Sequence, residues 1–169
     1  MMRTFAAIIL SLLFTFSAVA APVIPEAVSA LIPPTATLTD AEYDDGAWEY
    51  DFRDGDMRYE VIFANDTVVA LTTRNKAVQP AKANLLTEET ATLNLEGTVL
   101  YARAEKDDGN WVWKVIVQIE TDLIEYELHG ETGEILETEV YFGATITLPE
   151  TYRSLDLEWD DGRLELDLD

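Results

Sequence analysis

The most regular feature of the sequence is the alternation of apolar and polar residues in short runs. Trp48, Tyr50 and Phe52 alternate with charged residues, which is typical of a strand with one buried face. Further runs with the same period lie at 59–63, 67–73, 98–106, 111–119, 123–129 and 135–142. The Gly, Asn and Asp residues between them are typical of tight hairpins. The pattern predicts two antiparallel meanders.

A short helix is expected before each meander. The stretch from Glu26 to Leu31 fits one turn, and Pro33-Pro34 would end it. In the second case Thr87 is a suitable N-cap, and Gly97 is a suitable stop. These signals predict a helix of about two and a half turns after Thr87.

The tripeptide Asp-Asp-Gly occurs at 44–46, 107–109 and 160–162, each time beside aromatic or leucine alternation. Such repetition indicates an internal repeat. The sequence therefore predicts an α+β fold: two tandem repeats of a short helix packed on an antiparallel β-meander, with a C-terminal β-hairpin that extends or caps the sheet. The expected divisions are 21–75 for a divergent first repeat, 76–84 for a linker, 85–143 for the second repeat and 144–169 for the hairpin.

The first 20 residues have the features of a secretory signal peptide. A basic start is followed by an apolar run from Phe5 to Phe16 and by small residues around Ala18 to Ala20. The run is too short to cross a bilayer comfortably, and no later segment replaces it. We expect cleavage after Ala20 or Ala21, with the mature protein in the periplasm or secreted and without a membrane span.

The net charge of the chain limits the classes of molecule that it is expected to bind. The chain has 33 acidic and 11 basic residues, for a formal net charge of −22. Nucleic acids and anionic membranes would repel such a chain, whereas cationic partners would be attracted.

Catalytic chemistry has little support in the sequence. The chain lacks cysteine, which removes thiol catalysis and disulfides, and no serine has a Gly-x-Ser-x-Gly setting. The single histidine, His129, is expected at the surface beside a turn. We therefore expect no enzyme activity, no catalytic residue and no cofactor.

The acidic turns have two interpretations. Asp-Gly in a tight hairpin supplies the positive φ angles of a type I′ turn. Clustered carboxylates also bind calcium, but calcium takes six to eight oxygens and each turn offers only a few. The turn interpretation is favoured and no metal site is predicted; the metal-ligand candidates that remain are Asp44, Asp45, Asp107, Asp108, Asp160 and Asp161.

The tryptophans also allow two interpretations. Trp48, Trp111 and Trp113 lie in the alternating runs. Large rings at a period of two usually form the core face of a sheet. If these rings are exposed instead, they would form a platform for a sugar or a peptide.

Residues 85–140 resemble the PepSY domain family. The resemblance is carried by "DDGNWVWKVIVQIETDLIEYELHGETGEILE", which closes on Thr132-Gly133-Glu134-Ile135-Leu136, and by the preceding "LTEETATLNLEGTVLYARAE". Residues 24–75 match in outline, through "AEYDDGAWEYDF" and "RYEVIF". The chain is thus expected to contain tandem PepSY-like repeats.

The resemblance implies a small exported α+β module that binds proteins. Members occur in protease propeptides and as free envelope proteins, and the family is thought to inhibit or regulate peptidases without catalytic residues of its own. We therefore expect a non-catalytic protein-binding module that inhibits or regulates a secreted or periplasmic peptidase. The alternatives are calcium binding by the acidic turns and carbohydrate binding by exposed aromatic residues.

Overall fold

The computed structural model describes residues 22–168, except 45, 80, 149–154 and 161–162. The predicted signal peptide, residues 1–20, lies outside the described residues. Within them the chain forms ten strands and two helices, α1 (Glu26–Ser29) and α2 (Glu88–Thr92). No helix in this part of the chain is long and apolar enough to cross a membrane.

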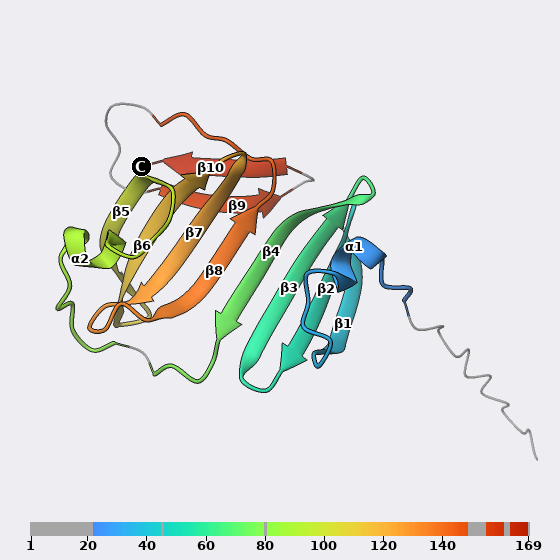
Figure 1. Cartoon of the computed structure of the whole chain (residues 1–169), viewed down its shortest axis with the longest axis horizontal. Helices are drawn as coiled ribbons and strands as arrows, with labels where there is room; N and C mark the ends of the chain where they lie inside the picture. The colour runs from blue at the N-terminus through green and yellow to red at the C-terminus, as the bar shows by residue number, and fades with distance from the viewer. Residues whose placement is uncertain (1–21, 45, 80, 149–154, 161–162, 169) are drawn as a thin grey trace, which may run out of the picture.

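Eight strands form one antiparallel sheet in the order β1-β2-β3-β4-β8-β7-β6-β5 (Figure 1). The first meander contains β1 (Thr37–Asp44), β2 (Ala47–Asp54), β3 (Met57–Ala64) and β4 (Thr67–Asn75). The second contains β5 (Thr98–Asp107), β6 (Asn110–Ile119), β7 (Asp122–His129) and β8 (Ile135–Tyr141). The meanders meet through their last strands, where Ala70 of β4 lies opposite Tyr141 of β8.

The predicted α+β class, with two helix-on-meander repeats, was wrong. The protein is mostly antiparallel β, because its helices have only four and five residues and both meanders belong to a single sheet. Two causes explain the difference. Helix α2 begins at a capping box of Thr87 and Thr90 and already ends at Thr92, and the β-branched Thr90 and Thr92 lower its helix propensity. Pairing of β4 with β8 also satisfies two strand edges that separate repeats would leave open.

Strand β1 was missed by the prediction, which placed three strands before the linker. Its residues alternate poorly because nearly all of them are exposed. β1 pairs with β2 from Thr37 opposite Arg53 to Asp44 opposite Ala47, with an irregularity between Leu38 and Asp40. The first meander therefore has four strands, and β1 forms one edge of the sheet.

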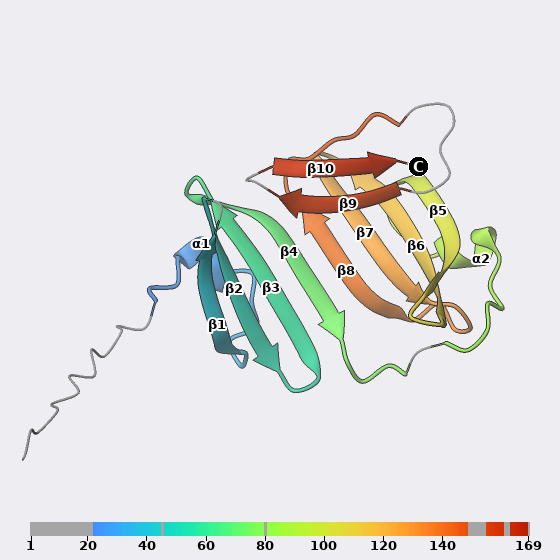
Figure 2. The same cartoon turned by 180° about the vertical axis from the view of Figure 1, so that it is seen from behind.

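The C-terminal hairpin consists of β9 (Leu155–Asp160) and β10 (Arg163–Leu168), which form a separate two-stranded sheet. It lies across one face of the large sheet, mainly over β5 to β8 (Figure 2). Leu155 and Leu157 are buried there against Ile116, Leu123 and other apolar residues of the large sheet. The hairpin thus caps the sheet, which is one of the two arrangements that the sequence predicted.

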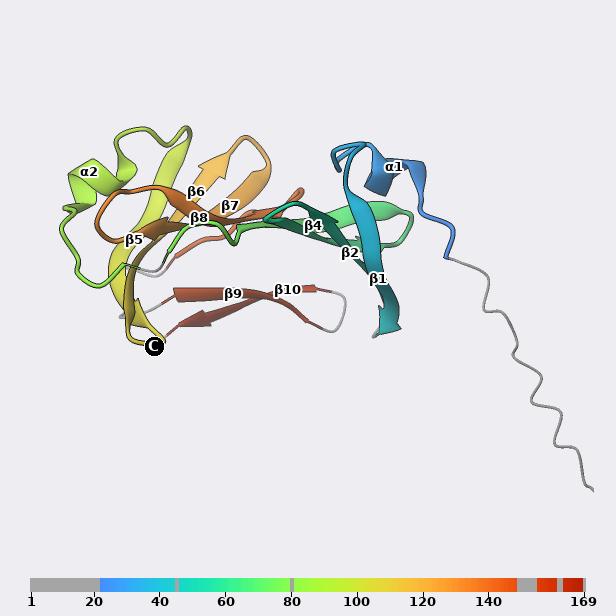
Figure 3. The ribbon, with the colours of Figure 1, turned by 90° about the horizontal axis from the view of Figure 1, so that it is seen from below.

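The opposite face of the sheet carries both helices (Figure 3). Under α1, the core contains Val28, Tyr50, Phe52 and Val61. Under α2, it contains Ala91, Trp113, Val115, Val117 and Leu128. The alternating aromatic residues of β2 and β6 are thus largely directed to the helix side, and residues between them, such as Asp51 of β2 and Lys114 and Ile116 of β6, face the hairpin side.

The segment expected as a linker is bonded to the second meander. Trp111 N donates to Ala81 O at 3.0 Å, and Leu85 N donates to Gly130 O at 2.9 Å. The carboxylate of Glu131 accepts the backbone N–H groups of Lys82 at 2.8 Å and of Ala83 at 2.9 Å. This tie requires glycine at position 130, because a Cβ there would lie 2.7 Å from Trp111 O.

Candidate functional site

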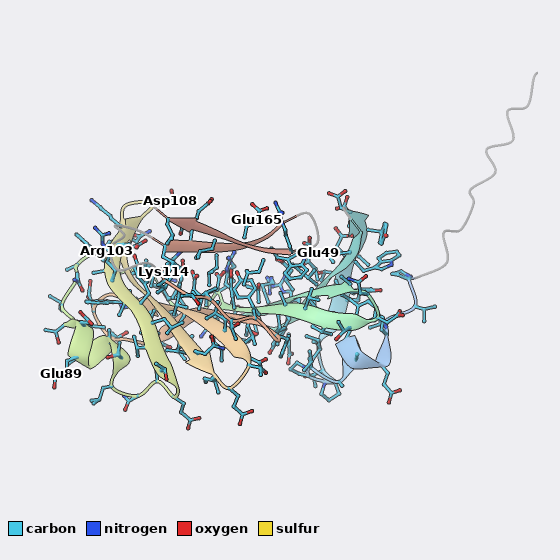
Figure 4. The ribbon with its side chains drawn as sticks, turned by 90° about the horizontal axis from the view of Figure 1, so that it is seen from above. Glu49, Glu89, Arg103, Asp108, Lys114 and Glu165 are labelled. Atoms are coloured by element: carbon cyan, nitrogen blue, oxygen red, sulfur yellow. The ribbon has the colours of Figure 1, made fainter. Side chains whose placement is uncertain are left out.

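The face of the sheet that carries the hairpin is only partly covered. The hairpin reaches Ile62 and Ala70 on β3 and β4, and the acidic residues beyond them remain accessible. Figure 4 shows Glu49 on this side of the sheet, near one end of the hairpin, and Glu89 on the opposite side. We call five carboxylates of β1 to β3 the open acidic face; three are exposed (Asp40, Glu42 and Glu49) and two are half-buried (Asp51 and Glu60).

The strand register brings these carboxylates together. Asp51 lies opposite both Asp40 on β1 and Glu60 on β3, and Glu42 lies opposite Glu49. Oxygens from Glu49, Asp51 and Glu60 lie within 4.8 Å of one another. Like charges directly opposite on neighbouring strands are destabilising. The sheet therefore holds a cluster of mutually repelling groups on an accessible surface.

The pKa values show the effect of this crowding. Partial burial raises the pKa of Glu60 to about 7, and the charges of Glu49 and Asp51 add to the shift. Burial, followed by the charge of Asp51, also raises the pKa of Glu49. The pKa of Asp51 is raised by burial and by Asp40. A positive charge brought to the cluster would lower all three pKa values.

The nearby arginines form their bonds elsewhere, although the charge of Arg74 lowers the pKa of Glu60 from a distance. Arg74 forms a two-point ion pair with Glu137, in which Nη2 donates to Oε1 at 2.6 Å. Arg53 and Arg58 each donate to the carbonyl of Gly55 at 3.1 Å, at the turn between β2 and β3. Among the residues described, none of these arginines forms an ion pair with Glu49, Asp51 or Glu60.

Two grooves border the cluster, and Glu60 lines both. One has a volume of about 340 Å³ and lies between β1 and β4, with Asp51, Arg58 and Arg74 in its walls. The other, of about 220 Å³, lies where the hairpin meets the sheet; we call it the hairpin groove. It is lined by Glu60, Ile62, Ala70, Thr72, Glu139, Tyr141, Leu157 and Trp159.

The predicted acidic turns lie elsewhere. Asp44 and Asp108 are exposed at hairpin ends, and Asp108 and Gly109 both have positive φ angles, as a type I′ turn requires. Asp107 and Asp160 end their strands opposite Asn110 and Arg163. Asp45 and Asp161 lie outside the described residues. The three carboxylates that the structure gathers, Glu49, Asp51 and Glu60, were not among the candidates.

A sequence signal for these three residues did exist. Glu49 and Asp51 occupy the polar positions of the same alternating run whose apolar positions are Trp48, Tyr50 and Phe52. The period of two places both carboxylates on one face. What could not be predicted was the register that places Glu60 beside them, and the pairing of Arg74 with Glu137 instead of with these carboxylates.

The tryptophans divide between core and surface. Trp113 is buried, with 7% of its surface exposed, and its indole N–H donates to Asn84 at 2.9 Å. Trp48 is 36% exposed and Tyr43 is 60% exposed. Their ring centroids lie 5.4 Å apart, and Trp48 also stacks on Tyr50 at 5.8 Å. A platform for a sugar ring is therefore reduced to Tyr43 and Trp48.

His129 was expected at the surface and is buried, with 8% of its surface exposed. Its Nδ1 accepts the backbone N–H groups of Glu131 at 3.3 Å and of Thr132 at 3.2 Å. The ring thus lies over the turn that follows β7 and serves as its internal cap. The cause is local, because the side chain bonds to backbone groups of its own turn.

No protein-family model and no curated protein matches the chain. Among solved structures, a cysteine-rich secretory protein from Staphylococcus aureus is similar to 70% of the chain, with a TM-score of 0.45 and 12% sequence identity. The match spans 44% of that protein's own chain.

Proposed function

We propose that the protein is an exported, non-catalytic binding module whose open acidic face binds a positively charged surface of another protein. The observation that carries this proposal is the cluster of Glu49, Asp51 and Glu60, which lie within 4.8 Å of one another and form no ion pair with a basic side chain among the described residues.

The energetics favour a cationic partner. The repulsion between these carboxylates lowers the stability of the free protein. A lysine or arginine brought to the cluster would relieve that repulsion, so part of the cost becomes binding free energy. The net charge of −22 adds long-range attraction that accelerates association with a basic surface.

A secreted or periplasmic peptidase is the partner class that we propose, because residues 85–140 resemble the PepSY family. The role would be inhibition or regulation by binding. The burial of His129 supports a non-catalytic role, since its Nδ1 is engaged by the amides of Glu131 and Thr132.

Binding to the open acidic face is tested with decalysine and two charge-matched variants. The face variant is Glu49→Gln/Asp51→Asn/Glu60→Gln, and the control is Glu88→Gln/Glu89→Gln/Glu134→Gln; both replace three carboxyl groups by amides, and the titration is run at pH 8, above the pKa of about 7 of Glu60. We expect the face variant to weaken binding by about tenfold or more in calorimetry, and the control by less than about threefold, because only the former removes direct contacts. Equal losses would contradict a specific face.

Calcium is the competing occupant of the same carboxylates, since it prefers oxygen ligands. Calorimetry with calcium chloride in moderate salt separates the two ligands. A saturable heat that disappears in the face variant, together with no binding of decalysine, would assign the cluster to a metal ion and overturn the proposal.

The peptidase class is tested by capture from an envelope extract with the mature protein, using the face variant as the matched bait. Peptidases retained by the first bait and not by the second are then assayed with each protein added. Absence of inhibition, or equal retention by both baits, would count against this class of partner.

A further inference from the structure

We propose that the hairpin groove is the anchor site for a single lysine or arginine side chain of the partner protein. This inference rests on the proposed function, because the groove adjoins the open acidic face and shares Glu60 with it.

The acceptors in the groove form a straight row across three strands. Thr72 of β4 lies opposite Glu60 of β3 on one side and opposite Glu139 of β8 on the other. With neighbouring strands about 4.8 Å apart, the two glutamates originate about 10 Å from each other. A cationic group above Thr72 would therefore lie between two carboxylates, with the threonine hydroxyl below it.

This set of acceptors suits a cation with several donors. A lysine ammonium has three N–H donors, and an arginine guanidinium has five. Glu60 and Thr72 make no side-chain hydrogen bond within the described part of the chain. Glu139 accepts a bond from the hydroxyl of Tyr141 at 2.5 Å. Burial, a hydrogen bond with Glu137 and the charge of that residue raise the pKa of Glu139, so a cation nearby would stabilise its ionised form.

The remaining walls suit the stem of such a side chain. Ile62, Ala70 and Leu157 supply apolar contacts, and Trp159 supplies an aromatic ring. Lysine and arginine bury their methylene groups along apolar surfaces, and their charged ends are attracted to the face of a tryptophan ring.

The protein's own cations nearby are already engaged. Lys114 Nζ lies 3.0 Å from Glu125 and 2.6 Å from Asp156. Arg74 is held by Glu137. The charge of Arg74 lowers the pKa of Glu60, and that of Lys114 lowers the pKa of Glu139. Neither basic residue lines the hairpin groove, so a cation seated in the groove itself would come from another molecule.

The size of the groove sets the class of ligand. Its volume of about 220 Å³ is below the range of about 300–1,000 Å³ typical for drug-sized ligands. One extended side chain fits this space better than a sugar or a cofactor. The groove therefore selects a single basic residue, while the open acidic face attracts the surface around it.

The test uses two short peptides, acetyl-Ala-Ala-Lys-Ala-Ala-amide and the same peptide with norleucine, an uncharged residue of similar shape. They are titrated into ¹⁵N-labelled protein while the four tryptophan indole signals are followed, with Trp159 assigned through Trp159→Phe. We expect the lysine peptide to shift the Trp159 signal and the norleucine peptide to leave it unchanged.

Two single substitutions complete the test. Glu60→Gln should weaken the lysine peptide by about tenfold, whereas Glu42→Gln, on the same face and outside the groove, should weaken it by less than about twofold. Glu60→Gln also resembles the protonated side chain, so it is expected to fold, which circular dichroism checks.

An unmoved Trp159 signal, or equal losses from Glu42→Gln and Glu60→Gln, would overturn the anchor site. Decalysine binding that still depends on the open acidic face would in that case leave the proposed function standing. If the lysine peptide leaves the Trp159 signal unmoved and decalysine binding does not depend on the open acidic face either, both the anchor site and the proposed function are contradicted.

Discussion

The ammonium of Lys114 lies 2.6 Å from the carboxylate of Asp156 and thereby joins the large sheet to the C-terminal hairpin. The same nitrogen lies 3.0 Å from Glu125, which is almost fully buried beneath the hairpin. This ion pair, with the apolar residues Leu155 and Leu157, fixes the hairpin in the position that forms one wall of the hairpin groove.

Replacement of Lys114 by methionine should destabilise the protein by about 3 kcal/mol at pH 8, because it leaves a buried carboxylate without its cation. The loss should be smaller at pH 5, since burial raises the pKa of Glu125 to about 7 and the group is then neutral. Denaturant unfolding measures both values. Lys114→Met/Glu125→Gln is the control and should recover much of the loss at pH 8; an equal loss in both variants would show that the charge of Glu125 is irrelevant.

Stability should fall as the pH rises from 5 to 8. Glu60 and Glu125 have folded-state pKa values of about 7, raised from 4.5, mainly by burial. The folded protein therefore holds more protons than the unfolded chain between these values, and the stabilisation present below pH 4.5 is lost as pH passes 7. Each group contributes at most about 1.4 kcal/mol per pH unit, and solvent screening reduces the share of the partly exposed Glu60.

Thermal unfolding between pH 5 and pH 8 measures this slope. Glu125→Gln should flatten it, because the substituted side chain no longer titrates. A melting temperature that rises across the same range in the unsubstituted protein would contradict the assignment of these two carboxyls.

Binding of the lysine peptide should strengthen as the pH rises from 6 to 8. Its ammonium binds the ionised form of Glu60, and the pKa of about 7 means that much of this group is protonated at pH 6. Binding at pH 6 should therefore release a proton, which calorimetry in two buffers of different ionisation enthalpy detects. The pH dependence should be absent in Glu60→Gln; an unchanged dependence there would assign it to another group.

Substitution of Gly130 by alanine should loosen the segment from Ala81 to Leu86. The added Cβ would lie 2.7 Å from Trp111 O and 3.0 Å from Ala83 O, and backbone atoms cannot move aside easily. We expect a loss of about 2 kcal/mol and faster hydrogen exchange at Leu85. Gly109→Asn is the control, because that site is open and asparagine tolerates its positive φ. Equal losses at both sites would contradict the close approach at Gly130.

Local patterns predicted the strands and turns well, and the reason is physical. Alternation fixes which side of a strand Tyr50, Phe52 and Trp113 face, and Asp-Gly fixes the positive φ angles of a tight turn. The arrangement of the strands in one sheet could not be predicted from local patterns in the same way. The pairing of β4 with β8 depends on two edges distant in sequence, and β1 carries too few buried residues to show a pattern.

The candidate site was harder to predict for a related reason. A carboxylate cluster depends on cross-strand register, which sets Asp51 opposite Glu60. It also depends on which carboxylates the arginines pair with. Arg74 pairs with Glu137, a residue of the other meander. The Asp-Asp-Gly turns are conspicuous in the sequence because they repeat. The cluster of Glu49, Asp51 and Glu60 instead occupies ordinary polar positions of two neighbouring strands.

Hydrogen–deuterium exchange of the protein with and without decalysine tests the central claim most directly. The open acidic face predicts slower exchange in β1 to β4 and in the hairpin next to Glu60, with little change in α2 or at the outer strand β5. Uniform slowing over all acidic segments, or slowing confined to the Asp-Asp-Gly turns, would contradict a binding site on this face.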